Sequence, residues 1–191
     1  MRVLKKEISI CYEIKKSKFL TYLVHYEDFY KTIEKLRKEH PKAIHYVWAY
    51  RYLKDGQIVE NQSDDGEPKN TAGKPALNVL TSQNLINCAV IIVRYFGGIK
   101  LGASGLVKAY TKAVTEAVLS AEFEKYIEYE NLKVSTRYEN FSKLEYLLKN
   151  FEARIVKKDF TEKDVILDIA IEKNKKESLF ERIKELITAF L

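Results

Sequence analysis

The sequence is poor in cysteine and proline and contains no long uninterrupted hydrophobic run. Its 191 residues include two cysteines, Cys11 and Cys88, and three prolines. Two cysteines cannot build a disulfide framework, and no stretch approaches the ~18 apolar residues of a membrane-spanning helix. The charged first residues lack the apolar centre of a signal peptide. We therefore expect a cytoplasmic protein with free thiols and no membrane segment, and we expect a monomer.

Glycine and proline are confined to the middle of the chain. All seven glycines and all three prolines lie between Pro41 and Gly105. Glycine is needed where φ is positive or where a backbone must approach another group closely. Special backbone geometry is therefore expected in this middle region, and plain strands and helices are expected after it.

The net charge of +6 belongs entirely to the front of the chain. Residues 1–125 contain 20 Lys and Arg against 14 Asp and Glu, whereas residues 126–191 contain 13 of each. Such an excess is compatible with a polyanion such as RNA, because phosphate contacts dominate that affinity. Many basic proteins of this size bind no nucleic acid, so charge alone decides little.

Hydrophobic periodicity predicts an α+β protein of two domains, residues 1–125 and 126–191. In the front domain we expect strands at about 4–14, 18–26, 45–53 and 88–93, helices at about 27–39, 73–82 and 103–121, and a polar loop at 54–75. The tail reads as strand 127–137, helix 139–150, strands 153–160 and 164–172, and helix 175–190. This βαββα order predicts a ferredoxin-like α/β sandwich that lacks its usual last strand.

The acidic segment NQSDDGEPKNTAGKP is the first candidate site. Asp64, Asp65 and Glu67 bring three carboxylates together around Gly66. They fit a cation site or a general acid/base pair, although the spacing matches no calcium loop. The alternative is a solvated turn in which Asp caps the chain and Thr71 N-caps the next helix.

The glycine-rich segment RYFGGIKLGASG is the second candidate, because it joins a buried strand to a helix. Helix N-terminal amides form an anion site, to which nearby cations add charge. Neither a Walker A loop nor a dinucleotide-binding fingerprint fits the spacing. A tight packing turn is the alternative. The candidate anion-binding or nucleic-acid-binding residues are Arg94, Tyr95, Gly97, Gly98, Lys100, Gly102 and Lys108.

The strand AIHYVWAYRY is the third candidate. Alternation places Tyr46, Trp48 and Tyr50 on one face, where they could stack on bases beside Arg51 or form core. His45, on the other face, is the histidine nearest the acidic loop and the one suited to proton transfer or metal ligation. The spacing completes no catalytic set and predicts no metal site and no cofactor. The candidate functional surface comprises His45, Arg51, Asp64, Asp65, Glu67 and Thr71.

DDGEP followed by TAGKP, an apolar strand and RYFGGIKLG…GLVKAY resembles the signature of the YigZ/IMPACT family. AIHYVWAYR resembles the family's H-x-C-x-A segment, with Val47 in place of the cysteine. The resemblance implies a front domain with the left-handed β-α-β fold of ribosomal protein S-five domain 2 and elongation factor G domain IV. It implies a rear domain similar to elongation factor G domain V. Eukaryotic relatives regulate translation through a ribosome-associated protein.

Two functions remain open at this point. The first is a non-enzymatic translation-associated module that binds RNA, the ribosome or a ribosome-bound protein, with Arg51, Arg94, Lys100 and Lys108 on phosphate. The second is an enzyme or small-ligand binder that uses the acidic and glycine loops together. The second requires the two loops to converge in space, and the sequence favours the first.

Overall fold

The apolar run CAVIIV forms the central strand of a five-stranded antiparallel sheet. A computed structural model describes all 191 residues and places β6 (Cys88–Tyr95) in the strand order β2-β3-β6-β4-β5. The other strands of this sheet are β2 (Ile8–Ile14), β3 (Ser17–His25), β4 (His45–Lys54) and β5 (Gln57–Ser63). All residues of β6 before Tyr95 are buried. A strand covered on both faces reads as a continuous hydrophobic run, which explains this sequence.

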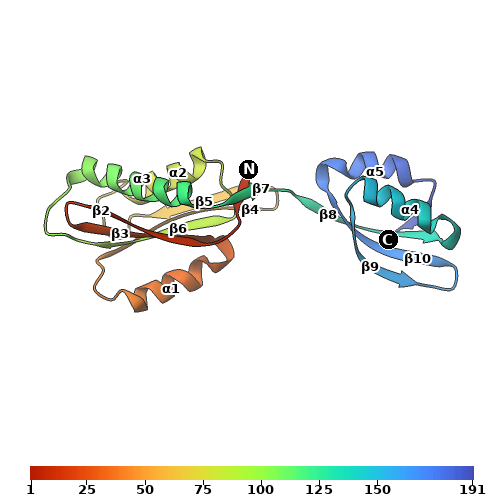
Figure 1. Cartoon of the computed structure of the whole chain (residues 1–191), viewed down its shortest axis with the longest axis horizontal. Helices are drawn as coiled ribbons and strands as arrows, with labels where there is room; N and C mark the ends of the chain where they lie inside the picture. The colour runs from red at the N-terminus through yellow and green to blue at the C-terminus, as the bar shows by residue number, and fades with distance from the viewer. The chain divides into compact units, whose positions relative to one another are not determined.

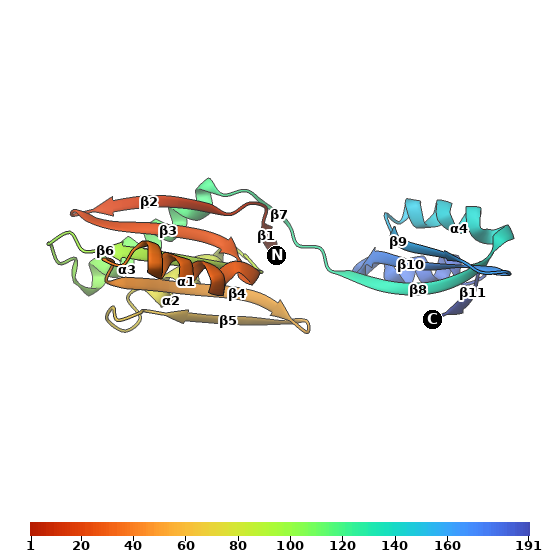
Figure 2. The same ribbon diagram turned by 90° about the horizontal axis from the view of Figure 1, so that it is seen from below.

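Helices cover both faces of the sheet, as Figure 1 and Figure 2 show. One face carries α1 (Phe29–Glu39), preceded by a short 3-10 turn, Tyr26–Asp28, and the other carries α2 (Gly73–Ser82) and α3 (Gly102–Ser120). In β4, Val47 and Ala49 pack in the core under α2 and α3, whereas Tyr46 and Tyr50 pack in the core under α1. The predicted alternation of this strand is confirmed.

Alanines at every fourth position form a small-residue ridge along α3. Ala109, Ala113 and Ala117 are fully buried, and the first two belong to the same core as Phe19 and Val90 of the sheet. Short side chains at every fourth position allow a helix to approach a sheet closely. The ridge therefore holds α3 close to β2 and β3.

The segment expected to be a polar loop contains a strand. β5 pairs with β4 through a two-residue turn at Asp55 and Gly56, whose φ values are +50° and +76°. Asp-Gly is a strong signal for such a hairpin turn, because both residues tolerate positive φ. The prediction was wrong because the strand's polar residues, at the sheet edge, hide the usual hydrophobic alternation.

A small second sheet joins the two ends of the front part. β1 (Arg2–Leu4) pairs antiparallel with β7 (Phe123–Lys125), so the expected first strand is two strands, β1 and β2. The chain then divides into two compact units, Met1–Tyr126 and Ile127–Leu191, which we call the front unit and the rear unit. No helix in either is long and apolar enough to span a bilayer.

The rear unit is a four-stranded antiparallel sheet with two helices. Its strand order is β11-β8-β10-β9. The elements are β8 (Tyr129–Arg137), α4 (Tyr138–Asn150), β9 (Arg154–Phe160), β10 (Asp164–Glu172), a 3-10 turn (Lys173–Lys175), α5 (Lys176–Ile183) and β11 (Ile187–Phe190). Leu144 and Leu148 of α4 share one core with Leu179 and Ile183 of α5. The βαββαβ order is that of a ferredoxin-like unit.

The expected absence of a last strand was wrong. The predicted helix 175–190 ends at Ile183, and β11 pairs with β8. The Thr136 hydroxyl also donates a 2.6 Å hydrogen bond to the Leu186 carbonyl. Leu186, Ile187 and Phe190 fit a helical stripe, but the open edge of β8 supplies backbone hydrogen bonds that favour the strand.

Candidate functional site

The acidic loop begins with a carboxylate that caps a helix. Asp64 Oδ1 accepts hydrogen bonds from the backbone N–H groups of Ala72 (3.0 Å) and Gly73 (2.8 Å), and Oδ2 accepts one from Asn70 (2.7 Å). These contacts hold the start of α2, where orphan N–H groups need an acceptor. The Thr71 hydroxyl donates instead to the Pro68 carbonyl at 2.6 Å, so the expected Thr71 cap is wrong.

Asp65 fixes the position of His45. Its carboxylate accepts a 2.6 Å hydrogen bond from the Tyr46 N–H and a 3.0 Å contact from Arg37. Its backbone carbonyl lies 2.7 Å from His45 Nδ1. Because a carbonyl oxygen can only accept a hydrogen bond, Nδ1 carries a proton and donates it to Asp65, and Nε2 lies on the side of the ring toward Glu67.

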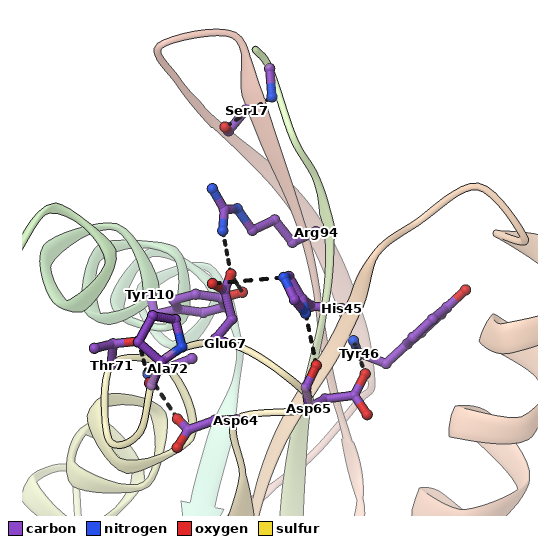
Figure 3. Close-up of polar contacts among 12 residues, drawn as sticks. Ser17, His45, Tyr46, Asp64, Asp65, Glu67, Thr71, Ala72, Arg94 and Tyr110 are labelled. Atoms are coloured by element: carbon purple, nitrogen blue, oxygen red, sulfur yellow. Dashed lines mark hydrogen bonds and ion pairs between the residues drawn. The ribbon is translucent and has the colours of Figure 1, made fainter. Parts of the chain in front are cut away.

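Glu67 is the centre of a buried polar network, which Figure 3 shows. Its side chain is only 3% exposed; Oε1 accepts hydrogen bonds from Arg94 Nη1 and, at 2.8 Å, from the Tyr110 hydroxyl. His45 Nε2 lies 3.7 Å from Oε2. Burial, followed by the negative charge of Glu67, raises the pKa of Tyr110, so its phenol stays protonated and donates.

The network joins the acidic loop to the elements on both sides of the glycine loop. Arg94 ends the buried part of β6 just before Gly97, and Tyr110 lies on α3 just after the loop. The required convergence therefore takes place through Glu67. Arg94 Nε is buried and has no hydrogen-bond partner, so one edge of the guanidinium is unused.

Arg51 and Arg94 are not the exposed contacts to RNA phosphates that the sequence suggested. Both residues are buried, with 6% and 5% of their surface exposed. Arg51 pairs with Glu60 at 2.9 Å and donates to the Leu85 carbonyl at 2.8 Å. Arg94 pairs with Glu67. The sequence shows an arginine in a strand but does not show that its charge is paired with a carboxylate of the same chain.

The aromatic row of β4 packs under α1, with Tyr46 and Tyr50 buried and Trp48 partly buried. Phe29 of α1 packs edge to face on Trp48 and on Tyr50, with ring centroids 5.3 Å apart in both cases. Tyr46 donates its hydroxyl to the His40 carbonyl at 2.7 Å. The α1 helix covers this face, so the base-stacking interpretation is wrong.

The glycine loop is partly bound and partly open. The Gly97 N–H donates to Ser17 Oγ at 3.1 Å, and a Cβ on Gly97 would overlap the backbone of Lys16. Gly98 and Gly102 have positive φ, and the space where their side chains would stand is open. The first turn of α3 has no side-chain cap. Amides of this turn therefore remain available to an anion.

The remaining loop residues separate into bound and free side chains. The Tyr95 hydroxyl lies 3.0 Å from His40 Nδ1, and the Tyr22 hydroxyl lies 3.2 Å from His40 Nε2. The Tyr95 hydroxyl is therefore already bound within the protein. Lys100 and Lys108 are exposed and form no ion pair. Sequence reasoning missed Lys15 and Lys16, whose hairpin lies against Gly97, because only the fold brings them there.

No group of three or more His, Cys, Asp or Glu side chains is placed to hold a metal ion. The two cysteines are free; Cys88 is buried and Cys11 is exposed. The carboxylates of the acidic loop are instead taken up by backbone amides, Arg37 and Arg94. The arrangement is therefore suited to holding the loops in place and to meeting an anion at the neighbouring surface.

Comparison with known proteins decides the family. Residues 15–118 match the model of the Impact N-terminal domain, and residues 134–187 match a domain of unknown function (DUF1949). This chain belongs to the IMPACT family. An IMPACT family member of Haemophilus influenzae is 38% identical over 152 residues, covering 78% of this chain and 74% of that protein. YigZ of Escherichia coli is 34% identical over 169 residues, covering 86% and 82%.

A solved structure described as that of a hypothetical protein extends the family comparison to both units. It is 31% identical and superposes with a TM-score of 0.67, covering 96% of this chain and 91% of that one. The family signature predicted from DDGEP, TAGKP and RYFGG is confirmed. The mixed α/β fold with antiparallel sheets in two units is confirmed as well.

Proposed function

We propose that this IMPACT family protein is a translation-associated regulatory module that binds RNA through the glycine-loop end of its front unit. One observation supports this most directly: the Lys15–Lys16 hairpin packs against Gly97 and adds two free cations to the loop. We call the surface formed by Lys15, Lys16, Phe96, Lys100 and the first turn of α3 the glycine-loop surface.

Each part of the glycine-loop surface has a free group that nucleic acid can use. The three lysines are exposed and unpaired, so they can neutralise phosphates. Phe96 is 46% exposed, and a base can stack on its ring. The uncapped amides of α3 add neutral donors for a phosphate oxygen.

The character of this surface favours a polymer over a small substrate. The acidic side chains next to it are already bound within the protein: Asp64 on α2, Asp65 on Tyr46 and Arg37, and Glu67 on Arg94 and Tyr110. They provide no free base for catalysis. Exposed cations together with an exposed ring are typical of sequence-tolerant binding to single strands.

Membership of the IMPACT family supports the translational part of this proposal. The yeast protein named Protein IMPACT homolog is 32% identical over 97 residues, covering 51% of this chain and 36% of that protein. The family resemblance described above implies that eukaryotic relatives regulate translation. In this proposal the ribosome or a ribosome-bound protein presents the RNA, and the protein acts in the cytoplasm.

The test measures binding of the full chain to a fluorescently labelled single-stranded RNA over a range of salt concentrations. The triple variant Lys15→Gln, Lys16→Gln, Lys100→Gln should bind more weakly. The slope of log K against log salt should fall by about 2, because each lost contact to a single strand removes ~0.7.

A matched control removes the same charge elsewhere on the front unit. Lys31, Lys38 and Lys54 are exposed and unpaired, and none lies in the glycine-loop surface. Their triple Gln variant should keep the wild-type slope. Equal losses in both variants, or RNA binding that does not depend on salt, would show that the proposed surface is not the binding site. Co-sedimentation with ribosomes under the same salt series tests the cellular partner.

The unused edge of Arg94 supports a second candidate function, the binding of a small carboxylate or phosphate. Its Nε is buried and unpartnered, and a guanidinium edge binds such groups in bidentate fashion. Inorganic phosphate should then raise the melting temperature of the wild-type protein and leave that of Arg94→Lys unchanged. An equal rise in both proteins would exclude Arg94 as the ligand.

A further inference from the structure

The front unit has a cavity of about 450 Å³ at the end of the sheet opposite the glycine loop. It is formed where β3 and β4 end and β6 begins, beside β1 and β7. The register His45↔Arg94 marks one end of the β4–β6 pair, and Arg51↔Cys88 marks the other. The residues between His45 and Tyr52 span roughly 23 Å at 3.3 Å each, so this cavity is separate from the Glu67 network.

Two stacked aromatic rings form part of the cavity wall. Tyr26 and Tyr52 lie with their ring centroids 3.9 Å apart and their planes within 8°. Burial, together with the neighbouring Tyr52 hydroxyl, raises the pKa of Tyr26, so its ring remains a neutral phenol. Neutral aromatic rings present negative faces that attract cations.

The charged side chains at this cavity are acidic and unpaired. Glu27 and Glu124 line it, and neither carboxylate forms an ion pair or a hydrogen bond. The lining contains no Lys or Arg, and His25 is the other titratable group apart from the tyrosines. The front part of the chain has an excess of positive charge. A local pair of free carboxylates beside aromatic rings is therefore a distinct feature that selects for positive charge.

Asn87 adds a further directed contact. It adopts positive φ (+55°), and its side-chain oxygen accepts the Leu53 N–H at 2.9 Å. This hydrogen bond fixes the amide group at the cavity wall. The cavity thus combines flat rings, two carboxylates and a fixed amide, which suits a planar cation better than a compact ammonium.

We propose that this cavity binds a guanidinium group carried on an aliphatic stem. The planar cation stacks on the Tyr26–Tyr52 pair and places its N–H groups toward Glu27 and Glu124. Both the side chain of a protein partner and free arginine carry this group, and the test separates these sources. The inference does not depend on RNA binding at the glycine-loop surface.

The test titrates the ¹⁵N-labelled full chain with Nα-acetyl-arginine amide, followed by NMR. Saturable shifts are expected at Tyr26, Tyr52, Asn87 and Glu124 at millimolar to tens of millimolar ligand. Nα-acetyl-citrulline amide is the neutral isostere and should produce no saturable shift. Free arginine that binds much more tightly than the blocked amide would identify a metabolite as the source, whereas equal affinity would identify a protein side chain.

Variants test the two recognition elements separately. Glu27→Gln with Glu124→Gln should weaken binding about three- to tenfold, and Tyr52→Leu should weaken it about two- to fivefold. Glu116→Gln removes a partly exposed carboxylate of α3, outside the cavity, and should leave affinity unchanged. Melting curves confirm that the variants are folded. The proposal is overturned by equal binding of the citrulline compound, by shifts elsewhere in the chain, or by unchanged affinity in the double Gln variant.

Discussion

The buried pair Glu67–Arg94 allows a quantitative test of the network at the candidate site. The side chains are 3% and 6% exposed, so neither charge is solvated. Replacing Glu67 with Gln keeps the size of the side chain and leaves Arg94 as a buried cation without a counter-charge. Breaking a buried ion pair in this way costs about 3 kcal/mol or more of the free energy of unfolding.

The magnitude translates into a large thermal shift. For a unit the size of Met1–Tyr126, about 3 kcal/mol corresponds to a fall in melting temperature of roughly 10 °C. The double variant Glu67→Gln, Arg94→Met removes both charges, and its loss should be clearly smaller than the sum of the two single losses. We expect a coupling energy of about 2 kcal/mol between the two positions.

The single tryptophan makes the assay specific to the front unit. Trp48 lies in β4 and packs against Phe29, so its fluorescence reports unfolding of this unit during urea titration. Glu116→Gln is the control, because its ion pair with Lys112 is partly exposed and should contribute less than about 1 kcal/mol. A Glu67→Gln loss as small as that of the control, or strictly additive losses in the double variant, would refute the argument.

Three further predictions follow from single contacts. Asp64→Ala removes the acceptor of three backbone N–H groups and should lower the free energy of unfolding by about 1–2 kcal/mol, measured by Trp48 fluorescence. A loss no larger than that of the Glu116 control would contradict the capping role. Gly97→Ala should destabilise more than Gly98→Ala, because its Cβ overlaps the Lys16 backbone whereas Gly98 has open space and only its positive φ opposes a side chain. Burial raises the pKa of the Cys88 thiol to about 12, and burial together with the charge of Glu13 raises the pKa of the exposed Cys11 thiol. A thiol reagent at pH 8 should therefore label Cys11 slowly, and faster as the pH rises, whereas Cys88 should react only after unfolding. Rapid labelling of Cys88 in the native protein would show that its site opens.

Some elements followed from the sequence because their physical cause is local. The all-apolar run of β6 required a strand covered on both faces, and the alanine spacing of α3 required a helix packed closely on a sheet. The family signature, read from contiguous residues, was also sufficient for the family assignment. The Asp55–Gly56 turn was equally local, and its signal was present in the sequence although the segment reads as a polar loop.

Other features depend on residues far apart in the chain, and periodicity carries no information about such pairs. Glu67 and Arg94 are separated by 27 positions and Lys16 and Gly97 by about three times as many, so the sequence placed Arg94 on the surface and overlooked the hairpin. The same applies to β11, since Ile187–Phe190 fits both a helix and a strand until β8 offers its edge. Local pattern determines which secondary structure a segment can form. The choice among equal local options, and the partner of each charge, is made by long-range contacts that exist only once the chain has folded.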